Sequence, residues 1–233
     1  MLDNQEKYDR LSAQEILKDA LEKYGDKVAL ASSFGAEDVV LIDMMMKINP
    51  GAKVFTLDTG RLNQETYDVM DAVRRKYGLS VQTMFPEAAA VIEMVEKDGF
   101  NLFYDSLDKR KLCCKVRKVL PLRRALGELD AWITGLRREQ AVTRADLHAV
   151  EWDEGFGLLK LNPLSNWTEA DVWNYIKENE VPYNSLHDRG YPSIGCEPCT
   201  RAIKTGEDVR AGRWWWENPE QKECGLHVKQ EKA

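Results

Sequence analysis

Residues 28–47 read VALASSFGAEDVVLIDMMMK, and this stretch decides the fold. Its first four residues, Val28-Ala29-Leu30-Ala31, form a short apolar run that is typical of a buried β-strand. The polar, glycine-containing residues 32–35 predict a turn. Residues 37–47 have the pattern of a helix, which Asn49-Pro50-Gly51 would end. A strand, a tight turn and a helix in this order predict one unit of an α/β fold.

The same alternation continues along the chain. We expect further strands over residues 54–57, 81–85, 131–134 and 158–161, and helices over residues 12–24, 63–77, 86–99, 113–126 and 168–179. Strands that alternate with helices predict an open, mostly parallel sheet with helices on both faces. Ligands bind such sheets beyond the carboxyl ends of the strands, which selects residues 32–35, 58–61 and 135–140 as one shared rim.

The composition changes near the C-terminus. From residue 206 the sequence is polar and rich in Trp, and it then ends in a charged tail. We therefore expect a nucleotide-binding α/β domain over residues 1–205, followed by a mobile C-terminal segment over residues 206–233.

The charge balance excludes some classes of function. The chain has 33 Lys and Arg against 39 Asp and Glu, a net charge of −6, whereas a general binder of nucleic acid or membrane surfaces needs a basic excess. No apolar run approaches the roughly 20 residues of a spanning helix. The N-terminus has no apolar core of a signal peptide. We expect a cytoplasmic protein with room for a local basic pocket.

The five cysteines form two pairs and a single residue. Because the number is odd and the cytosol keeps thiols reduced, a disulfide framework is not expected. In Cys196-Glu197-Pro198-Cys199 the turn can place two thiolates on one metal. Two adjacent helical cysteines, Cys113 and Cys114, point roughly 100° apart, which strains a single tetrahedral site but suits a larger iron–sulfur cluster. We expect a [4Fe–4S] cluster, while zinc and a merely buried cysteine pair stay open.

Two further positions have a functional and a plain interpretation. Cys224 is either a surface thiol or a nucleophile that Gly225 leaves accessible and His227 supplies with a base or a positive charge. A free thiol is only a few per cent thiolate at neutral pH, so nearby cations would activate it. Lys118 lies four residues after Cys114 on the same helix face. Lys118 is either part of a solvated basic face, or it lies between a cluster and an anionic substrate.

Seven motifs together resemble the assimilatory adenylyl-sulfate (APS) reductases. They are Ser32-Ser33-Phe34-Gly35-Ala36-Glu37-Asp38, Leu57-Asp58-Thr59-Gly60-Arg61, Cys113-Cys114, Gly135-Leu136-Arg137-Arg138-Glu139-Gln140, Tyr183-Asn184-Ser185-Leu186-His187-Asp188, Gly195-Cys196-Glu197-Pro198-Cys199 and Glu223-Cys224-Gly225-Leu226-His227. The similarity runs from about Val28 to His227. The paired cysteines and the E-C-G-L-H tail are highly specific together.

The resemblance implies an adenine-nucleotide alpha-hydrolase-like fold and a [4Fe–4S] cluster on Cys113, Cys114, Cys196 and Cys199 that undergoes no net redox change. It also implies thioredoxin as the electron donor, in sulfate assimilation for cysteine biosynthesis. The thiolate of Cys224 would attack the sulfate sulfur of APS, releasing AMP and leaving an S-sulfocysteine. Thioredoxin would then attack this intermediate and release sulfite.

The residues that the resemblance assigns to the site fall into two groups. The catalytic group is Cys224 with Lys118 and His227. The substrate-binding group is Ser32, Ser33, Phe34, Gly35, Asp58, Thr59, Gly60, Arg61, Gly135, Arg137, Arg144, Arg210 and Arg213. Lys118, Arg144, Arg210 and Arg213 are the cations expected around the phosphosulfate. We further expect a homo-oligomer that binds neither nucleic acid nor membranes.

Three other functions stay open at this point. A 3′-phosphoadenylyl-sulfate (PAPS) reductase has the same fold and tail, but members selective for PAPS generally lack the cluster cysteines, and some cluster-bearing members accept both substrates. A sulfur-transfer enzyme acting on RNA would need a basic surface, which the net charge of −6 disfavours. A non-enzymatic iron–sulfur or zinc module would leave Cys224 and the nucleotide-type rim unexplained.

Overall fold

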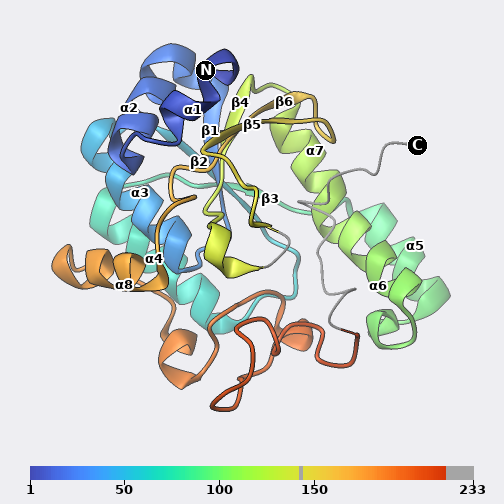
Figure 1. The fold of residues 1–233 in the computed structure, drawn as a ribbon. Helices are drawn as coiled ribbons and strands as arrows, with labels where there is room; N and C mark the ends of the chain where they lie inside the picture. Colours follow the sequence, from blue (N-terminus) through green and yellow to red (C-terminus); the bar gives the residue numbers. More distant parts are fainter. Residues whose placement is uncertain (142–143, 219–233) are drawn as a thin grey trace. The chain divides into compact units, whose positions relative to one another are not determined.

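The centre of the fold is a sheet of six strands in the order β3-β2-β1-β4-β6-β5 (Figure 1). The computed structural model describes residues 1–141 and 144–218. The strands are β1 (Val28–Ser32), β2 (Lys53–Leu57), β3 (Gln82–Met84), β4 (Ala131–Ile133), β5 (Val150–Asp153) and β6 (Leu158–Leu161). The pairs β1–β2, β1–β4 and β4–β6 are parallel, and β5 pairs antiparallel with β6. The prediction of an open, mostly parallel α/β sheet is confirmed.

Burial along the central strands agrees with a sheet that is covered on both faces. Successive side chains of a strand point to opposite faces, yet every residue of β4 and β6 is buried, as are four of the five in β1. This explains why the strands have continuous apolar sequences such as Val28-Ala29-Leu30. Because β1 and β4 are parallel, the loops that follow them leave the same edge of the sheet.

The helices are α1 (Gln5–Tyr8), α2 (Ala13–Tyr24), α3 (Ala36–Ile48), α4 (Gln64–Tyr77), α5 (Ala88–Asp98), α6 (Leu107–Cys114), α7 (Leu120–Leu126) and α8 (Glu169–Glu178). The chain forms two compact units. Unit 1 comprises Met1–Thr56, Glu65–Gln82 and Glu128–Asn184, and unit 2 comprises Leu57–Gln64, Thr83–Gly127 and the chain from Ser185 onward. The predicted domain boundary at residue 205 stays a prediction.

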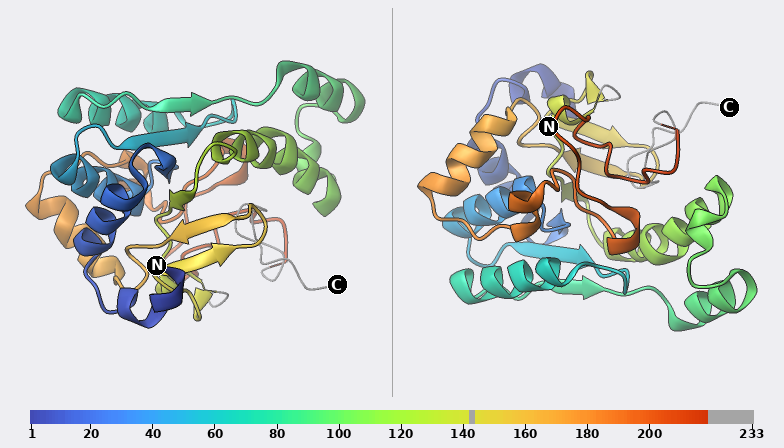
Figure 2. Two further views of the ribbon diagram at one scale, coloured as in Figure 1. Left: turned by 90° about the horizontal axis from the view of Figure 1, so that it is seen from above. Right: turned by 90° about the horizontal axis from the view of Figure 1, so that it is seen from below.

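Unit 1 contains the larger apolar core. Side chains from α2, α3, α4 and α8 pack with those of β1, β4 and β6 in one cluster. Both views in Figure 2 show α3 next to α8, in agreement with their contacts. The N-terminus of α2 has the predicted capping box, in which Glu15 N–H donates to Ser12 Oγ (3.2 Å) and Ser12 N–H to Glu15 Oε2 (2.7 Å).

Unit 2 contains a smaller core around the cysteines. Cys196 and Cys199 are buried together with Phe103, Val116 and Trp214, and Cys113 and Cys114 pack against them. The cysteine-bearing helix begins at Leu107, six residues earlier than predicted, because Ser106 caps it by accepting from the N–H of Lys109 (3.2 Å).

The middle of this cysteine-bearing helix is a π-helix over Lys115–Val119, in which Leu120 N–H donates to the carbonyl of Lys115, five residues earlier. Pro121 follows directly. A proline has no N–H to donate to the carbonyl four residues earlier, and its ring crowds that carbonyl. The wider turn therefore relieves the crowding at Arg117.

Other elements also differ from the sequence prediction. Strand β5 was not predicted, because Val150 is its one buried residue, the other three are half-exposed or exposed, and Trp152 is 51% exposed. This is the pattern of an edge strand rather than of a buried run. Helix α5 begins at Ala88 rather than at Pro86, with Glu87 as its N-cap.

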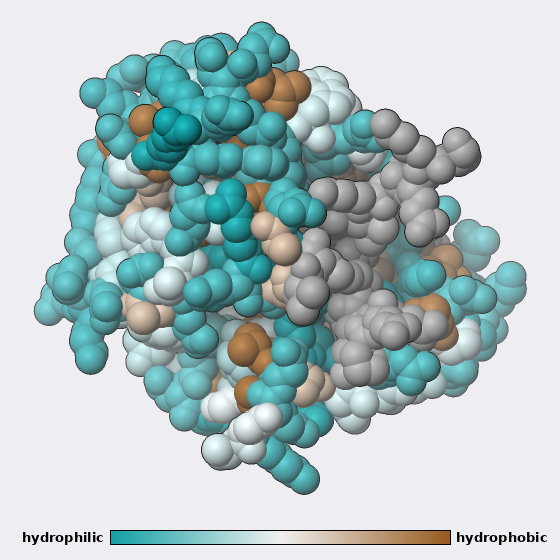
Figure 3. All heavy atoms as spheres, viewed as in Figure 1, coloured by the Kyte–Doolittle hydropathy of each residue, from teal (hydrophilic) through white to brown (hydrophobic). Residues whose placement is uncertain are grey.

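The surface is mainly polar on the face shown in Figure 3, where hydrophilic residues dominate and apolar ones form small separate patches. Among the described residues, no helix combines the length and apolar character that crossing a membrane requires. The cytoplasmic location stays a prediction.

Candidate functional site

One candidate site is the loop after β1 in unit 1. Ser32 and Phe34 are buried, and Phe34 has a left-handed backbone with φ of 59°. This conformation is rare for a residue with a bulky side chain, and such residues cluster at functional sites. It turns the chain into the N-terminus of α3, where Gly35 is the N-cap and offers no side-chain cap to the first N–H groups. Such N–H groups form a general anion-binding site.

Asp38 holds this loop from the first turn of α3. Its Oδ2 accepts from the N–H of Ser33 (2.6 Å) and from Ser33 Oγ (2.7 Å). Burial raises the pKa of Asp38 to about 6, although the hydrogen bonds from Ser33 oppose this shift, and the nearby charge of Glu37 adds to it. The loop therefore has a buried carboxyl that titrates close to neutral pH.

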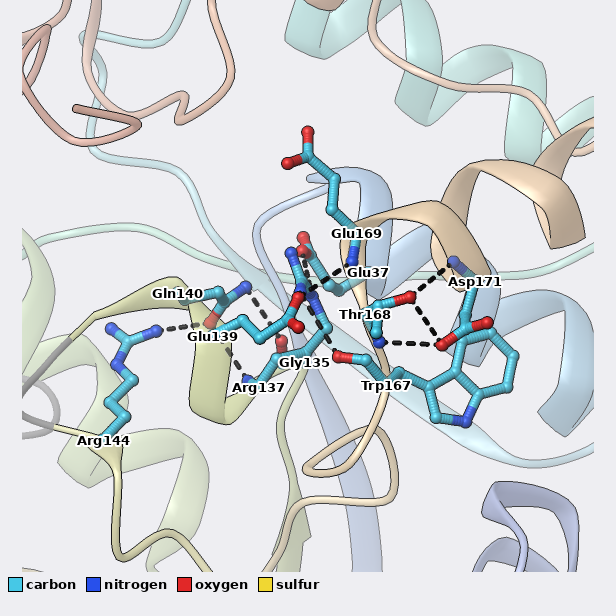
Figure 4. A network of polar contacts seen from close by, with 10 residues as sticks. All are labelled: Glu37, Gly135, Arg137, Glu139, Gln140, Arg144, Trp167, Thr168, Glu169 and Asp171. Carbon is cyan, nitrogen blue, oxygen red and sulfur yellow. Dashed lines mark hydrogen bonds and ion pairs between the residues drawn. The ribbon is translucent and has the colours of Figure 1, made fainter. Parts of the chain in front are cut away.

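The loop after β4 packs against this first turn (Figure 4). Arg137 Nε donates to Glu37 Oε1 (2.8 Å), and its Nη1 donates to the carbonyl of Trp167 (3.3 Å) and lies 3.5 Å from Glu139 Oε2. Arg137 is 6% exposed. The described contacts of Arg137 thus join the two loops, and a contact with substrate stays a prediction.

Gly135 lies at the closest approach of the two loops. A Cβ atom at this position would overlap Asp38 Oδ1 and come within 2.9 Å of Glu37 Cβ. Gln140 closes the turn that follows, because its Oε1 accepts from the N–H of Arg137 (3.1 Å) and from the guanidinium of Arg144, as Figure 4 shows. Sequence reasoning did not identify Glu37, Asp38 or Gln140 as positioning residues, although all three are part of the quoted motifs.

A second candidate site is a pocket in unit 2, which all four paired cysteines line. The residues around this pocket are Arg61, Phe103, Arg110, Cys113, Cys114, Arg117, Lys118, Cys196, Pro198, Cys199, Arg213 and Trp214. Cys113 and Cys114 come from α6, Cys199 comes from a short 3₁₀ helix over Glu197–Cys199, and Cys196 is the N-cap of that helix. The structure thus brings together two cysteine pairs that are far apart in the sequence.

The segment after β2 supports the pocket. Thr59 Oγ1 lies 3.2 Å from Cys196 Sγ at hydrogen-bonding distance, and the carbonyl of Thr59 accepts from Arg117 Nη1 (2.7 Å). The carbonyl of Arg61 accepts from the N–H of Glu197 (2.8 Å). Asp58 Oδ1 accepts from the N–H of Gly60 (2.8 Å) and closes this turn. The predicted residues 58–61 therefore lie in unit 2 beside the cysteines, and their part in a rim shared with unit 1 stays a prediction.

A cation–π arrangement forms one wall of the pocket. Arg110 is 1% exposed, and its guanidinium donates to both carboxylate oxygens of Glu217 (2.9 and 2.8 Å). The guanidinium groups of Arg110 and Arg213 lie 4.6 and 4.7 Å from the ring centroid of Trp214. Sequence reasoning did not identify Arg110 or Glu217, because a buried arginine inside the run Lys109-Arg110-Lys111 resembles a solvated basic face.

The chemistry of the pocket suits a group bound by thiolates. Burial raises the pKa of Cys199 to about 12, and the charge of Cys196 adds to this shift, whereas Lys118 and Arg213 oppose it. Burial also raises the pKa of Cys113. A soft cation or cluster would reverse this burial penalty, since it binds the deprotonated sulfur. Among residues 1–141 and 144–218, no group of three or more Cys, His, Asp or Glu could hold one metal ion. The [4Fe–4S] cluster, and the choice between it and zinc, stay predictions.

The remaining predicted residues have the following places. Lys118 and Arg213 line the cysteine pocket. Arg210 precedes Arg213 in a turn, where its carbonyl accepts from the N–H of Arg213 (2.9 Å). Cys224 and His227 lie outside the described residues.

Comparisons with known proteins identify the family. Residues 27–202 match the family described as "Phosphoadenosine phosphosulfate reductase domain". The chain is 54% identical over 202 residues to an adenosine 5'-phosphosulfate reductase from Allochromatium vinosum, covering 87% of this chain and 79% of that protein. It is 55% identical over 203 residues to the protein of the same name from Burkholderia cepacia, covering 87% of this chain and 81% of that protein.

A solved structure agrees with these sequence matches. The phosphoadenylyl-sulfate (PAPS) reductase from Candida auris, crystallised as a phosphate complex, has a TM-score of 0.71 and 34% identity, and the match covers 83% of this chain and 91% of that one. The resemblance inferred from the motifs is thereby confirmed, and the chain belongs to the phosphoadenosine phosphosulfate reductase family.

Proposed function

We propose that the protein reduces APS to sulfite and AMP, with thioredoxin as the electron donor. The names of the relatives from A. vinosum and B. cepacia support APS as the substrate. The observation that carries the proposal is the pocket of unit 2, where four cysteines lie together with Lys118 and Arg213. Such a set unites ligands for a cluster with cations for an anionic substrate.

The reaction is a covalent transfer in three steps. The thiolate of Cys224 attacks the sulfur of the sulfate group, an S–S bond forms, and the bond from this sulfur to the bridging phosphate oxygen breaks, so that AMP leaves with the bonding electron pair. A thiolate of thioredoxin then attacks the sulfur of Cys224, and sulfite leaves with the electron pair of the S–S bond. The second thiol of thioredoxin resolves the mixed disulfide, which restores the Cys224 thiolate and oxidises thioredoxin by two electrons.

The residues of this chain have electrostatic and binding roles in these steps. A thiolate repels a dianionic phosphosulfate, so cations near the reacting sulfur lower the barrier. We assign this role to Lys118, Arg210 and Arg213, with Arg144 as a further cation. We assign nucleotide binding to the loop after β1, residues 32–35, with Arg61, Gly135 and Arg137. His227 would supply a positive charge or a base beside Cys224.

The four paired cysteines would hold a [4Fe–4S] cluster. When bound, the cluster supplies a compact charged group beside the cations of the pocket, and it undergoes no net redox change. Iron and acid-labile sulfide should each approach four atoms per chain in protein purified without oxygen, giving a brown colour. A colourless, zinc-containing and fully active protein would contradict the assignment.

The test of the function is sulfite release from APS with reduced thioredoxin, run beside intact-mass measurement without thioredoxin. The wild-type protein should gain the mass of SO₃ after incubation with APS, and Cys224→Ser should not, because a serine hydroxyl is a far weaker nucleophile than a thiolate. Cys113→Ser is the matched control. It removes one of the four proposed cluster ligands, so it should lose iron, but it keeps the Cys224 thiol. Normal turnover by Cys224→Ser would show that the nucleophile is wrongly assigned.

The second candidate is reduction of PAPS, alone or together with APS. The similarity to the C. auris PAPS reductase favours it. Comparing kcat/KM for the two nucleotides decides between them, and a clear preference for PAPS would overturn the proposed substrate.

A further inference from the structure

The N-terminal segment of unit 1 is fastened to the end of the loop that carries Arg137 and Arg144. Gln5 Nε2 donates to the carbonyl of Val150 in β5 (2.8 Å). Four residues later, Asp9 Oδ1 accepts from the N–H of Ala149 (2.8 Å), and Asp9 Oδ2 lies 2.6 Å from His148 Nδ1. One carboxylate thus binds two successive residues at the point where the loop returns to the sheet.

Arg138 extends this contact to the beginning of the same loop. Its Nε donates to the carbonyl of Leu147 (2.6 Å), its Nη2 lies 3.7 Å from Asp9 Oδ1, and its Nη1 donates to Asn166 Oδ1. Asn166 Nδ2 in turn donates to the backbone carbonyl of Asp9 (2.8 Å). Asp9, Arg138 and Asn166 therefore form a closed polar ring around the base of the loop.

The chemistry of Asp9 suits a fixed contact. Its side chain is 20% exposed, and His148 and Arg138 beside it are 44% and 34% exposed. Burial raises the pKa of Asp9, but the N–H of Ala149 and the neighbouring His148 and Arg138 outweigh burial and lower it below its ordinary value. The charged carboxylate is thus the form that the fold stabilises. Hydrogen bonds to a charged group are stronger than those between neutral groups.

We propose that Asp9 is a positioning residue for residues 144–149, the part of the nucleotide-binding loop after β4 that carries Arg144. The loop begins at Gly135, which packs against the first turn of α3, and the ring around Asp9 fixes its other end. Arg144 lies five residues before Ala149, close to this fixed end, and its guanidinium donates to Gln140 Oε1. This inference rests on the proposed function, because it assigns that loop to the binding of APS.

The predicted effect is on binding rather than on chemistry. Without these contacts Arg144 is less well positioned, so KM for APS should rise about tenfold or more in Asp9→Ala, while kcat at saturating APS stays within about twofold. Asp9→Asn keeps an acceptor for Ala149 but loses the charge opposite His148 and Arg138, so its KM should be intermediate. Gln5→Ala is the matched control. It removes a contact of the same segment to β5 and leaves the ring intact, so its KM should not change.

Hydrogen exchange measured by mass spectrometry makes the inference testable apart from catalysis. In Asp9→Ala, the peptide that contains residues 144–149 should exchange at least about tenfold faster, because the N–H of Ala149 loses its acceptor. The melting temperature is compared in parallel. An unchanged KM and unchanged exchange in Asp9→Ala would overturn the inference. Equal changes in KM and kcat, or the same KM change in Gln5→Ala, would also overturn it, since they indicate a general loss of structure.

The two proposals fail in different ways. If the wild-type protein releases no sulfite from either APS or PAPS, the proposed function is wrong, whatever the exchange data show. If it does release sulfite, but KM is the same in Asp9→Ala and wild type, the positioning role is wrong while the function stands.

Discussion

Asp38 is the residue whose ionisation the fold changes most clearly in the nucleotide-type loop. Its carboxyl is buried at the first turn of α3, and its pKa is about 6 instead of 3.8. Gly135 contributes to this burial, because the absence of a Cβ lets the loop after β4 lie against the carboxyl. A larger residue at position 135 would have to push Asp38 or Glu37 aside. The same glycine therefore sets both the spacing of the two loops and the environment of the acid.

The raised pKa predicts a pH dependence of stability with a definite sign. Between pH 3.8 and about 6, the folded protein holds a proton on Asp38 that the unfolded chain has released. The contribution of Asp38 to the free energy of unfolding therefore falls as pH rises through this window and is constant above it. The fall should be at most about 3 kcal/mol, from a shift of about two pKa units at 1.36 kcal/mol each.

Urea unfolding at several pH values, with wild type and Asp38→Asn compared, isolates this contribution. Asn keeps an acceptor for Ser33 but does not titrate, and all other groups contribute equally to both proteins. The stability of the wild type relative to the variant should decrease between about pH 4 and pH 7. A difference that stays constant over this range, or that increases with pH, would show that burial does not raise the pKa of Asp38.

At the scale of elements, the π-helix over Lys115–Val119 sets the relation between the cysteine pair and the basic residues that follow it. Cys113 and Cys114 end α6, and Lys118 lies one wide turn later, yet all three line the same pocket. A regular α-helix would rotate the residues after the π-turn relative to the cysteines, since its turn contains fewer residues.

Pro121→Ala should change this element, because alanine restores an N–H that can bond to the carbonyl of Arg117 four residues earlier. Alanine also favours the α-helix, so the helix should gain stability. The cysteine pair and Lys118, however, would lose the relative spacing on which we expect the proposed cluster to depend. We expect a folded protein with about half or less of the wild-type iron content. Iron and sulfide analysis and the melting temperature are the measurements. Pro86→Ala, which lies before α5 and outside the pocket, is the control. Full iron loading in Pro121→Ala would contradict the role of the π-turn.

Elements also show what the sequence could and could not reveal. The apolar run at Val28–Ala31, the capping box at Ser12 and the helix end at Asn49-Pro50 are local signals, and the structure agrees with each. The motif residues around Ser33 and the cysteines were also recognisable. The edge strand at Trp152 was missed because only one of its four residues, Val150, is buried. The partners of Arg137 and Arg110 were missed because they come from distant segments: Glu37 lies 100 residues away and Glu217 lies 107 residues away.

At the scale of the whole molecule, the net charge and the local charge have opposite signs. The chain as a whole has a charge of −6, which repels a dianionic nucleotide. The pocket of unit 2, however, is lined by Arg61, Arg117, Lys118 and Arg213 in addition to Arg110, whose charge Glu217 balances. At an ionic strength of 0.1 M the Debye length is about 10 Å, so distant surface acids are screened while cations next to the ligand are not. The local charge should therefore dominate the capture of substrate.

Salt dependence tests which charge governs binding. Raising NaCl from about 50 to about 500 mM should lower kcat/KM for APS about three- to tenfold, because screening weakens the attraction between the pocket and the substrate. Lys118→Gln should lower the rate at every salt concentration and flatten this dependence. Inhibition by adenosine, which has no charge, serves as the control and should change little with salt. If kcat/KM for APS instead rises with salt, repulsion by the net negative charge governs the encounter, and the cations of the pocket do not attract the substrate as proposed.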